Sequence, residues 1–181
     1  MKATGIVRRI DDLGRVVIPK EIRRTMRIRE GDPLEIFTDR EGEVIFKKYS
    51  PVGEINAFAE QYAETLHKTC DLSVLICDRD GIVASSGVPK REFTEKRISE
   101  DLEDIIERRV FYKYATGGRK VLPTTDGASY YATCIMPIVS NGDASGCVIS
   151  LERSQIDRLP NETEVKLVQT AAGFLGRQFS Q

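Results

Sequence analysis

The sequence predicts two domains: a β-rich unit at residues 1–50 and an α+β unit at residues 54–181, joined by a linker at residues 51–53. Three observations support this division. Residues 1–29 hold nine basic and three acidic side chains, which gives +6 in a chain of net charge −1. Short apolar runs of strand length dominate the first 50 residues. In the remainder, long stripes of apolar residues at helical spacing alternate with such runs.

The first 50 residues contain four strand-like runs and one short helix. The runs lie at residues 3–10, 15–18, 34–38 and 44–48, and a hairpin loop at residues 39–43 joins the last two. Gly14 lies in the turn before the second run, where it can adopt a positive φ. Pro19 fits the first position of a helix that ends near Met26, with Arg23 and Arg24 pointing away from its apolar face. Since the unit is short and has no disulfide or metal, we expect it to dimerise.

Arginine supplies most of the positive charge in residues 1–29. This side chain is favoured where a planar group binds phosphate or guanine through two hydrogen bonds. A solvated surface could also carry such charges, but their clustering on an otherwise acidic chain favours double-stranded DNA as the partner. No helix-turn-helix is readable in these residues. Strands, loops and the helix after Pro19 would therefore have to read the bases.

Four segments of this unit match a known pattern, namely residues 4–9, 12–19, 21–25 and 34–36. They resemble the AbrB-type transition-state regulators. The resemblance implies a swapped-hairpin barrel, in which two chains interleave their hairpins, and hence a homodimer. It also implies that the DNA-contacting residues are Arg8, Arg9, Arg15, Arg23 and Arg24.

Residues 54–181 are expected to follow the order helix, strand, strand, helix, loop, strand, strand, helix. The expected ranges are 54–68, 72–77, 82–86, 99–109, 110–128, 130–138, 146–152 and 161–180, with one strand near 120–122 inside the loop. A hairpin signal lies at residues 140–143, and Asn161 can cap the last helix with Glu164 three residues on. This order predicts an antiparallel sheet with helices on one side, and it resembles a GAF domain, a ligand-sensing fold.

The two halves together resemble a family of sporulation regulators, and the closing residues 170–178 support this. The resemblance implies a regulator that activates and represses late sporulation genes in the forespore. Packing of the C-terminal helices against a second dimer would make a homotetramer. The GAF-like domain could sense a small molecule, with residues 110–128 as a lid and no binding residues assigned, or it could serve assembly alone.

Composition excludes several other classes. No apolar run could span a bilayer, and residues 1–5 contain no apolar signal segment. The four cysteines form no CxxC pair, and the single histidine, His67, is expected to face solvent or the end of its helix. We therefore expect buried reduced thiols, no metal, no cofactor and a cytoplasmic location.

Two other functions stay open. No P-loop, GxGxxG, HExxH or GxSxG motif is present, so no catalytic residue is expected. Some GAF proteins nevertheless reduce methionine sulfoxide through cysteines, and Cys77, Cys134 and Cys147 are the candidates here. Their apolar neighbours disfavour a reactive thiol. An antitoxin that occludes a toxin would fit the swapped hairpin, but it fits the large C-terminal domain poorly.

Overall fold

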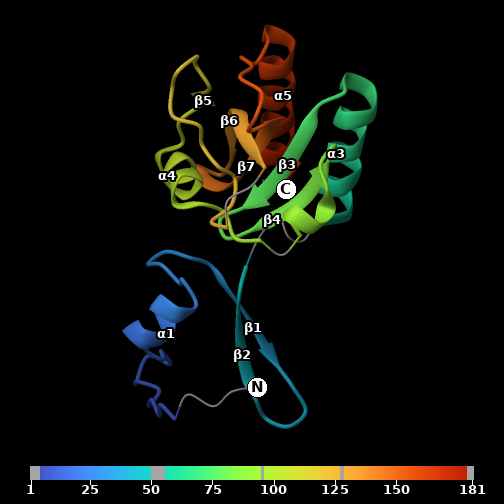
Figure 1. Cartoon of the computed structure of the whole chain (residues 1–181). Coiled ribbons are helices and arrows are strands. Elements are labelled where there is room, and N and C mark those ends of the chain that lie inside the picture. Colours follow the sequence, from blue (N-terminus) through green and yellow to red (C-terminus); the bar gives the residue numbers. More distant parts are fainter. Residues whose placement is uncertain (1–4, 50–55, 95, 127–128, 179–181) are drawn as a thin grey trace. The chain divides into compact units, whose positions relative to one another are not determined.

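The computed structural model describes residues 5–49, 56–94, 96–126 and 129–178. The chain divides into two compact units, Met1–Tyr49 and Ser50–Gln181 (Figure 1). The predicted linker at residues 51–53 lies outside the described residues, as do residues 54–55 and 179–180 at the ends of two predicted helices. Within the described part, no helix is both long and apolar enough to cross a membrane.

The N-terminal unit contains one short helix and one hairpin. Helix α1 is Lys20–Thr25, and the antiparallel strands β1 and β2 are Leu34–Thr38 and Val44–Lys48. In the connecting loop, Asp39 Oδ1 accepts hydrogen bonds from the backbone N–H groups of Glu41 and Glu43. These ranges confirm the predicted helix and hairpin, which local turn chemistry and period-two alternation specify.

Two predicted strands are wrong for the single chain. Residues 5–10 and 15–18 belong to no strand, and residues 3–4 lie outside the described part. Strand formation requires a neighbouring strand to satisfy backbone N–H and C=O groups. Within the described residues of this unit, the one ladder joins β1 to β2. The strand-like runs are not paired with either strand of this hairpin, so they form no strand in the single chain.

The described N-terminal unit has no buried residue at all. Its exposed apolar side chains are Ile6, Val7, Ile10, Leu13, Val16, Val17, Met26, Ile36, Phe37, Val44, Ile45, Phe46 and Tyr49. Apolar area left in water forfeits about 25 cal/mol per Å², and contiguous exposed apolar surface is typical of an interaction site. Stable folding of this unit therefore requires another surface to cover these side chains.

The C-terminal unit is built on a five-stranded antiparallel sheet in the order β4-β3-β7-β6-β5. Its strands are β3 Ser73–Asp78, β4 Ile82–Ser86, β5 Tyr112–Lys113, β6 Tyr130–Ser140 and β7 Asp143–Arg153. Its helices are α3 Asn56–Cys70, the 3₁₀ turn Lys90–Glu92, α4 Glu100–Arg108 and α5 Glu162–Gln178. The predicted order is otherwise confirmed, but the 3₁₀ turn and the short strand β5 were not predicted, and the strand expected near residues 120–122 is only the isolated bridge between Val121 and Ala132.

Helices cover both faces of this sheet, which corrects the expectation of helices on one side. Buried residues of α3 and α5 pack with Ile76 against one face. Buried residues of α4, such as Leu102, pack with Leu75 against the other face. Successive strand residues point to opposite faces, so β3, which is apolar at both positions, needs cover on both sides.

Turn and cap residues set the ends of several elements. Asn141 and Gly142 have φ of 50° and 87°, the two positive values that a tight type I′ hairpin turn requires. As a result, β6 and β7 run up to the turn and are longer than predicted. The predicted Asn161 cap is confirmed, since Asn161 Oδ1 accepts from Glu164 N at 2.8 Å. Helix α4 also has a cap that was not predicted, in which Ser99 Oγ accepts from Leu102 N at 3.2 Å.

Helix α5 approaches the sheet most closely at a glycine. A Cβ added at Gly176 would lie 2.4 Å from the carbonyl oxygen of Val139, whereas a Cβ at Gly173 would meet nothing within 4 Å. We expect Gly176→Ala to destabilise the C-terminal unit by about 1–3 kcal/mol through overpacking. The control Gly173→Ala should stabilise it by up to about 1 kcal/mol, because alanine favours helix. Thermal unfolding checks both, and equal melting temperatures would contradict the close approach.

Candidate nucleic-acid interface

Net positive charge in the N-terminal unit comes from residues 1–29 alone. Residues 30–49 hold three basic and six acidic side chains, against nine and three in residues 1–29. The whole unit is therefore +3, which is less than the value for residues 1–29 alone. The candidate DNA surface consists of the segment before α1, together with α1 itself, and does not include the acidic β1–β2 hairpin (Figure 1).

A five-residue loop, Asp11–Arg15, presents the first candidate contact. The Asp11 carboxylate accepts from Arg15 N and Leu13 N through Oδ1, at 2.8 and 3.0 Å, and from Arg15 Nε through Oδ2 at 2.8 Å. The backbone closes the same loop, since Asp11 N donates to Arg15 O at 2.9 Å. The hydrogen bond from the Arg15 backbone N–H is the main cause that lowers the pKa of Asp11. Gly14 permits the turn with a φ of 76°.

Helix α1 carries two more candidate contacts, Arg23 and Arg24, in its last turn, where basic side chains interact favourably with the helix dipole. Arg24 is exposed, as predicted. Arg23 is only partly exposed, and its Nε is buried without a hydrogen-bond partner among the described residues. A buried donor left unpaired is costly. Arg23 is therefore the candidate residue whose side chain most needs an acceptor from outside the described single chain.

Arg8 and Arg9 are both exposed in the segment before the loop. Arg8 Nη1 donates to the neighbouring Val7 carbonyl at 3.2 Å. Among the five candidate arginines, Arg15 has an ion pair within the described residues, the one with Asp11. No hydrogen bond or ion pair of the described residues joins the Arg8–Arg9 pair, the loop and α1 to one another. The five residues thus form three separate groups on the single chain.

The segment predicted as a lid, residues 110–128, is tied to its surroundings at several points. Tyr114 donates its hydroxyl hydrogen to Asp157 Oδ1 at 2.6 Å, which raises the pKa of Tyr114 to about 12. Lys120 Nζ donates to the carbonyls of Ser154 and Ile156 and lies 4.2 Å from the centre of the Tyr131 ring. No sequence pattern indicated the three hydrogen bonds, because their partners are 34 to 43 residues apart.

A buried acid lies in the first turn of α5. Glu164, whose side chain is 1% exposed, accepts from Thr133 Oγ1 at 2.6 Å and from Arg158 Nη1 at 2.7 Å. Arg158 also binds Glu152 at 2.7 Å. Burial acts to raise the pKa of Glu164, but the hydrogen bonds from Arg158, Thr133 and Ser150 outweigh it and leave that pKa lowered. The sequence analysis identified Glu164 only as a capping position.

The cysteines lie in surroundings unfavourable to thiolate chemistry. Cys77, Cys134 and Cys147 are buried and free, and Cys70 is partly exposed. Burial raises the pKa of Cys134 to about 12 and that of Cys147 well above its ordinary value. Nucleophilic cysteines need a stabilised, accessible thiolate. No cluster of three or more His, Cys, Asp or Glu side chains suited to a metal occurs among the residues that the structure describes.

Arginines clustered in residues 8–29 of a unit with no buried residue among those described, followed by a sheet covered by helices, indicate the class: a DNA-binding regulator with a GAF-like domain. Residues 54–180 match the family described as "Stage V sporulation protein T C-terminal, transcription factor". Stage V sporulation protein T of Bacillus subtilis (strain 168) is 54% identical over 183 residues, covering 100% of both chains. The chain therefore belongs to the stage V sporulation protein T family of transcription factors.

The N-terminal unit has relatives of its own. The transition state regulatory protein AbrB of Bacillus subtilis is 63% identical over 51 residues, which are 28% of this chain and 52% of that protein. The solution structure of the N-domain of the transcription factor abrB, 63% identical, matches 28% of this chain and 96% of that one, with a TM-score of 0.26. Residues 7–54 also match the family "Antidote-toxin recognition MazE, bacterial antitoxin". The sequence identity to AbrB confirms the predicted type of N-terminal unit.

The C-terminal unit has the predicted GAF fold. The GAF domain/HD domain protein from Geobacter sulfurreducens is 14% identical and superposes over 71% of this chain and 94% of that one, with a TM-score of 0.52. At this identity the likeness concerns the fold alone. The prediction of an antiparallel sheet with helices in a GAF-like arrangement is confirmed.

Proposed function

We propose that this transcription factor binds double-stranded DNA as a swapped-hairpin homodimer formed by residues 1–50. Arg8, Arg9, Arg15, Arg23 and Arg24 are its DNA contacts. The observation that carries the proposal is the N-terminal unit without a single buried described residue, next to a concentrated set of arginines. Two interleaved chains would bury the exposed apolar side chains and pair the strand-like runs at residues 5–10 and 15–18, while the arginines remain accessible.

The genes under control are those of late sporulation, and the protein activates some and represses others. This part of the proposal follows from the relative that matches the whole chain, a stage V sporulation protein. Because chromosomal DNA is the partner, the protein works in the cytoplasm, specifically that of the forespore. Selection of bound duplexes from a random library tests sequence-specific binding. One enriched motif is expected, and a pool without any motif would contradict the proposal.

One observation favours a second candidate function. The MazE antitoxin match at residues 7–54 is consistent with binding of a toxin protein through the same unit. That match leaves the C-terminal domain unexplained, whereas the transcription-factor family accounts for residues 54–180. DNA binding is therefore the function we favour.

Residues 54–181 are proposed to assemble dimers into a homotetramer. Phe58 and Tyr62 on α3 stack with Phe174 on α5, with ring centres 5.7 to 6.3 Å apart. Phe58 and Phe174 are nonetheless 37% and 39% exposed. These three stacked, partly exposed rings are the proposed helix-to-helix contact with another protomer, since aromatic residues are enriched in interfaces. Two DNA-binding units in one tetramer would raise avidity through effective concentration.

Light scattering tests this assembly. We expect a tetramer for the full chain, a dimer for residues 1–50, and a dimer for the full-length variant Phe174→Glu, whose charge could not be buried in the contact. The control Phe46→Glu alters an exposed aromatic side chain of the N-terminal unit, so it should disrupt the other interface. A wild-type chain that is dimeric at all concentrations would contradict the tetramer.

The GAF-like domain is proposed to sense a small molecule, with residues 110–128 as the segment that responds. The contacts of Tyr114 and Lys120 join this segment to the residues before α5, the helix that we place in the tetramer contact. Ligand binding could therefore change helix packing and DNA affinity together, a coupling that must be reciprocal. A thermal-shift panel of metabolites tests this idea. If no compound both binds and alters DNA affinity, the domain serves assembly alone.

A further inference from the structure

The Asp11–Arg15 loop holds its arginine in an unusual way for an exposed side chain. One carboxylate oxygen of Asp11 binds two backbone N–H groups of the loop, and the other oxygen binds Arg15 Nε. The backbone hydrogen bond from Gly14 N to Asp11 O, at 3.0 Å, completes the turn. A single acid therefore shapes the loop and also orients the side chain that the loop presents.

This arrangement leaves a defined part of the guanidinium for DNA. The Arg15 side chain is 68% exposed although its Nε is bound. The two terminal nitrogens remain for an end-on, bidentate contact with the O6 and N7 atoms of guanine. Holding a long side chain in one orientation before binding also reduces the entropy that binding would otherwise cost.

The same carboxylate weakens the attraction between Arg15 and phosphate. Non-specific binding arises from positive charge near the DNA backbone and carries no sequence information. A negative charge 2.8 Å from Arg15 Nε opposes that attraction at short range. It does not remove the hydrogen-bond donors that a base contact uses.

We propose that Asp11 is a positioning and specificity-determining residue, which directs Arg15 toward base recognition and away from non-specific phosphate binding. This inference rests on the proposed function, because it requires Arg15 to contact DNA. It concerns the ratio of specific to non-specific affinity more than affinity itself.

The two oxygens of Asp11 permit a sharp test. In Asp11→Asn, the amide oxygen keeps the acceptor for the backbone N–H groups of Leu13 and Arg15, whereas the NH₂ group cannot accept from Arg15 Nε. The loop is retained and only the hold on Arg15 is released. The matched control is Asp12→Asn, which removes the same charge from an exposed acid of the same loop that takes no part in these hydrogen bonds.

The full-length chain is titrated with two fluorescent duplexes, one selected from a random library by the wild-type protein and one with the same bases shuffled. For Asp11→Asn we expect the ratio of the two affinities to fall about tenfold, with tighter binding to the shuffled duplex. Asp12→Asn should also tighten both complexes slightly but leave the ratio unchanged. Circular dichroism and light scattering confirm that each variant keeps its fold and assembly.

Arg15→Ala and the double variant Asp11→Asn/Arg15→Ala separate the possible failures. If Asp11 acts through Arg15, Asp11→Asn has no further effect on the ratio once Arg15 has been replaced with alanine. If Arg15→Ala lowers the ratio but Asp11→Asn does not, the positioning role is overturned while the proposed function stands. If Arg15→Ala leaves the ratio unchanged, the proposed DNA contact by Arg15 and the role of Asp11 both fail.

Discussion

Replacing Arg15 or Arg23 with alanine abolishes specific DNA binding while the N-terminal dimer stays folded. A lost base contact costs roughly 1–3 kcal/mol, and a dimer loses two copies of it. Operator affinity should therefore fall at least about 30-fold. If the lost contact is with phosphate, the slope of log affinity against log salt should decrease by about 0.9 per contact. Fluorescence anisotropy at several salt concentrations measures both quantities.

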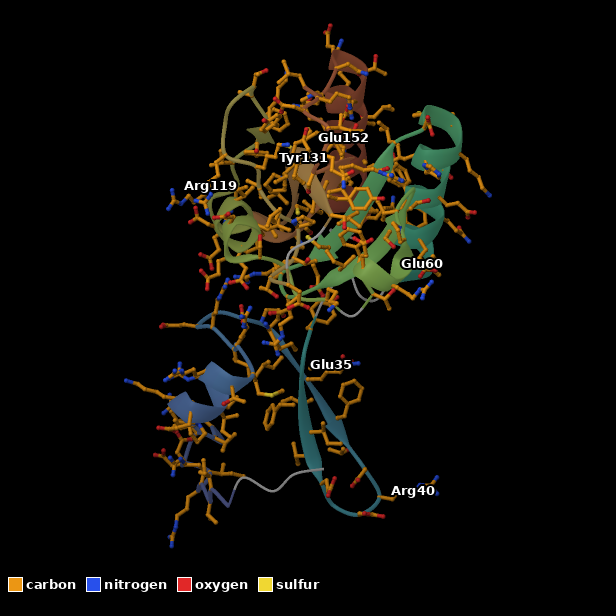
Figure 2. All side chains as sticks on the ribbon, viewed as in Figure 1. Glu35, Arg40, Glu60, Arg119, Tyr131 and Glu152 are labelled. Atoms are coloured by element: carbon orange, nitrogen blue, oxygen red, sulfur yellow. The ribbon has the colours of Figure 1, made fainter. Side chains whose placement is uncertain are left out.

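The control for this prediction is Arg40→Ala. Arg40 is exposed at the tip of the β1–β2 hairpin and extends away from it (Figure 2). Its replacement removes one positive charge from the same unit, as Arg15→Ala and Arg23→Ala do. It should alter affinity by less than about twofold, consistent with general electrostatics alone. Unchanged operator affinity in Arg15→Ala and Arg23→Ala, with a native circular-dichroism spectrum, would contradict the assigned contacts.

Arg23 allows a finer distinction, because its Nε is buried without a partner among the described residues. If Arg23→Ala dissociates the dimer in sedimentation experiments, the acceptor of this side chain belongs to the other chain. If the dimer persists and only DNA binding is lost, the acceptor is on the DNA. Arg24→Ala serves as the comparison, since Arg24 is exposed on the same helical turn.

Replacing Arg158 with alanine destabilises the C-terminal unit by up to about 3 kcal/mol, the low end for a fully buried pair, because Glu164 is buried but the Arg158 side chain is 36% exposed. Glu164 would keep its burial but lose its strongest donor, the guanidinium at 2.7 Å. The control Arg119→Ala removes an exposed ion pair with Asp101, whose side chains are 80% and 34% exposed. That change should cost at most about 1 kcal/mol. Figure 2 shows Arg119 at the periphery of this unit.

Urea unfolding monitored by tyrosine fluorescence measures both variants, since five of the six tyrosines follow residue 50. Equal stability of Arg158→Ala and Arg119→Ala would contradict the importance of the buried pair. The double variant Arg158→Ala/Glu164→Gln should recover part of the loss, because it removes the unpaired charge along with its former partner.

The ion pair between Arg158 and Glu164 predicts that the stability of the C-terminal unit depends on pH. The pKa of Glu164 is lowered in the folded state, so the stability that it contributes is fully present above the pKa of the unfolded chain. This contribution is lost as the pH falls through the folded value. In Arg158→Ala the donor is missing and burial raises the pKa of Glu164 instead. The difference in unfolding free energy between wild type and Arg158→Ala should therefore narrow from pH 7 to about pH 3. A difference that stays constant would contradict the role of Glu164 ionisation.

The sequence by itself determined most elements of secondary structure. Helix α1, the β1–β2 hairpin and the strands β3 and β4 lie where periodicity placed them, within one residue of the expected ranges. Local interactions explain this agreement: Asp39 Oδ1 accepts backbone hydrogen bonds within the β1–β2 loop, and Asp78 Oδ1 does so within the β3–β4 turn. Such signals involve residues only a few positions apart, so they are readable without the fold. The two-part class of the protein followed from the charge distribution and the order of these elements.

The tertiary structure alone decided which surfaces meet. Periodicity indicates that a helix has an apolar face but not which side of a sheet it covers. The expectation of helices on one side is therefore wrong, because α4 covers the face opposite to α3 and α5. The hydrogen bonds of Thr133 with Glu164 and of Lys120 with the Ser154 carbonyl join residues more than 30 positions apart, whose proximity arises only after the strands associate. Residues 5–10 and 15–18 show the converse: their composition favours strands, but hydrogen bonding in a strand requires a neighbour that the single chain does not supply.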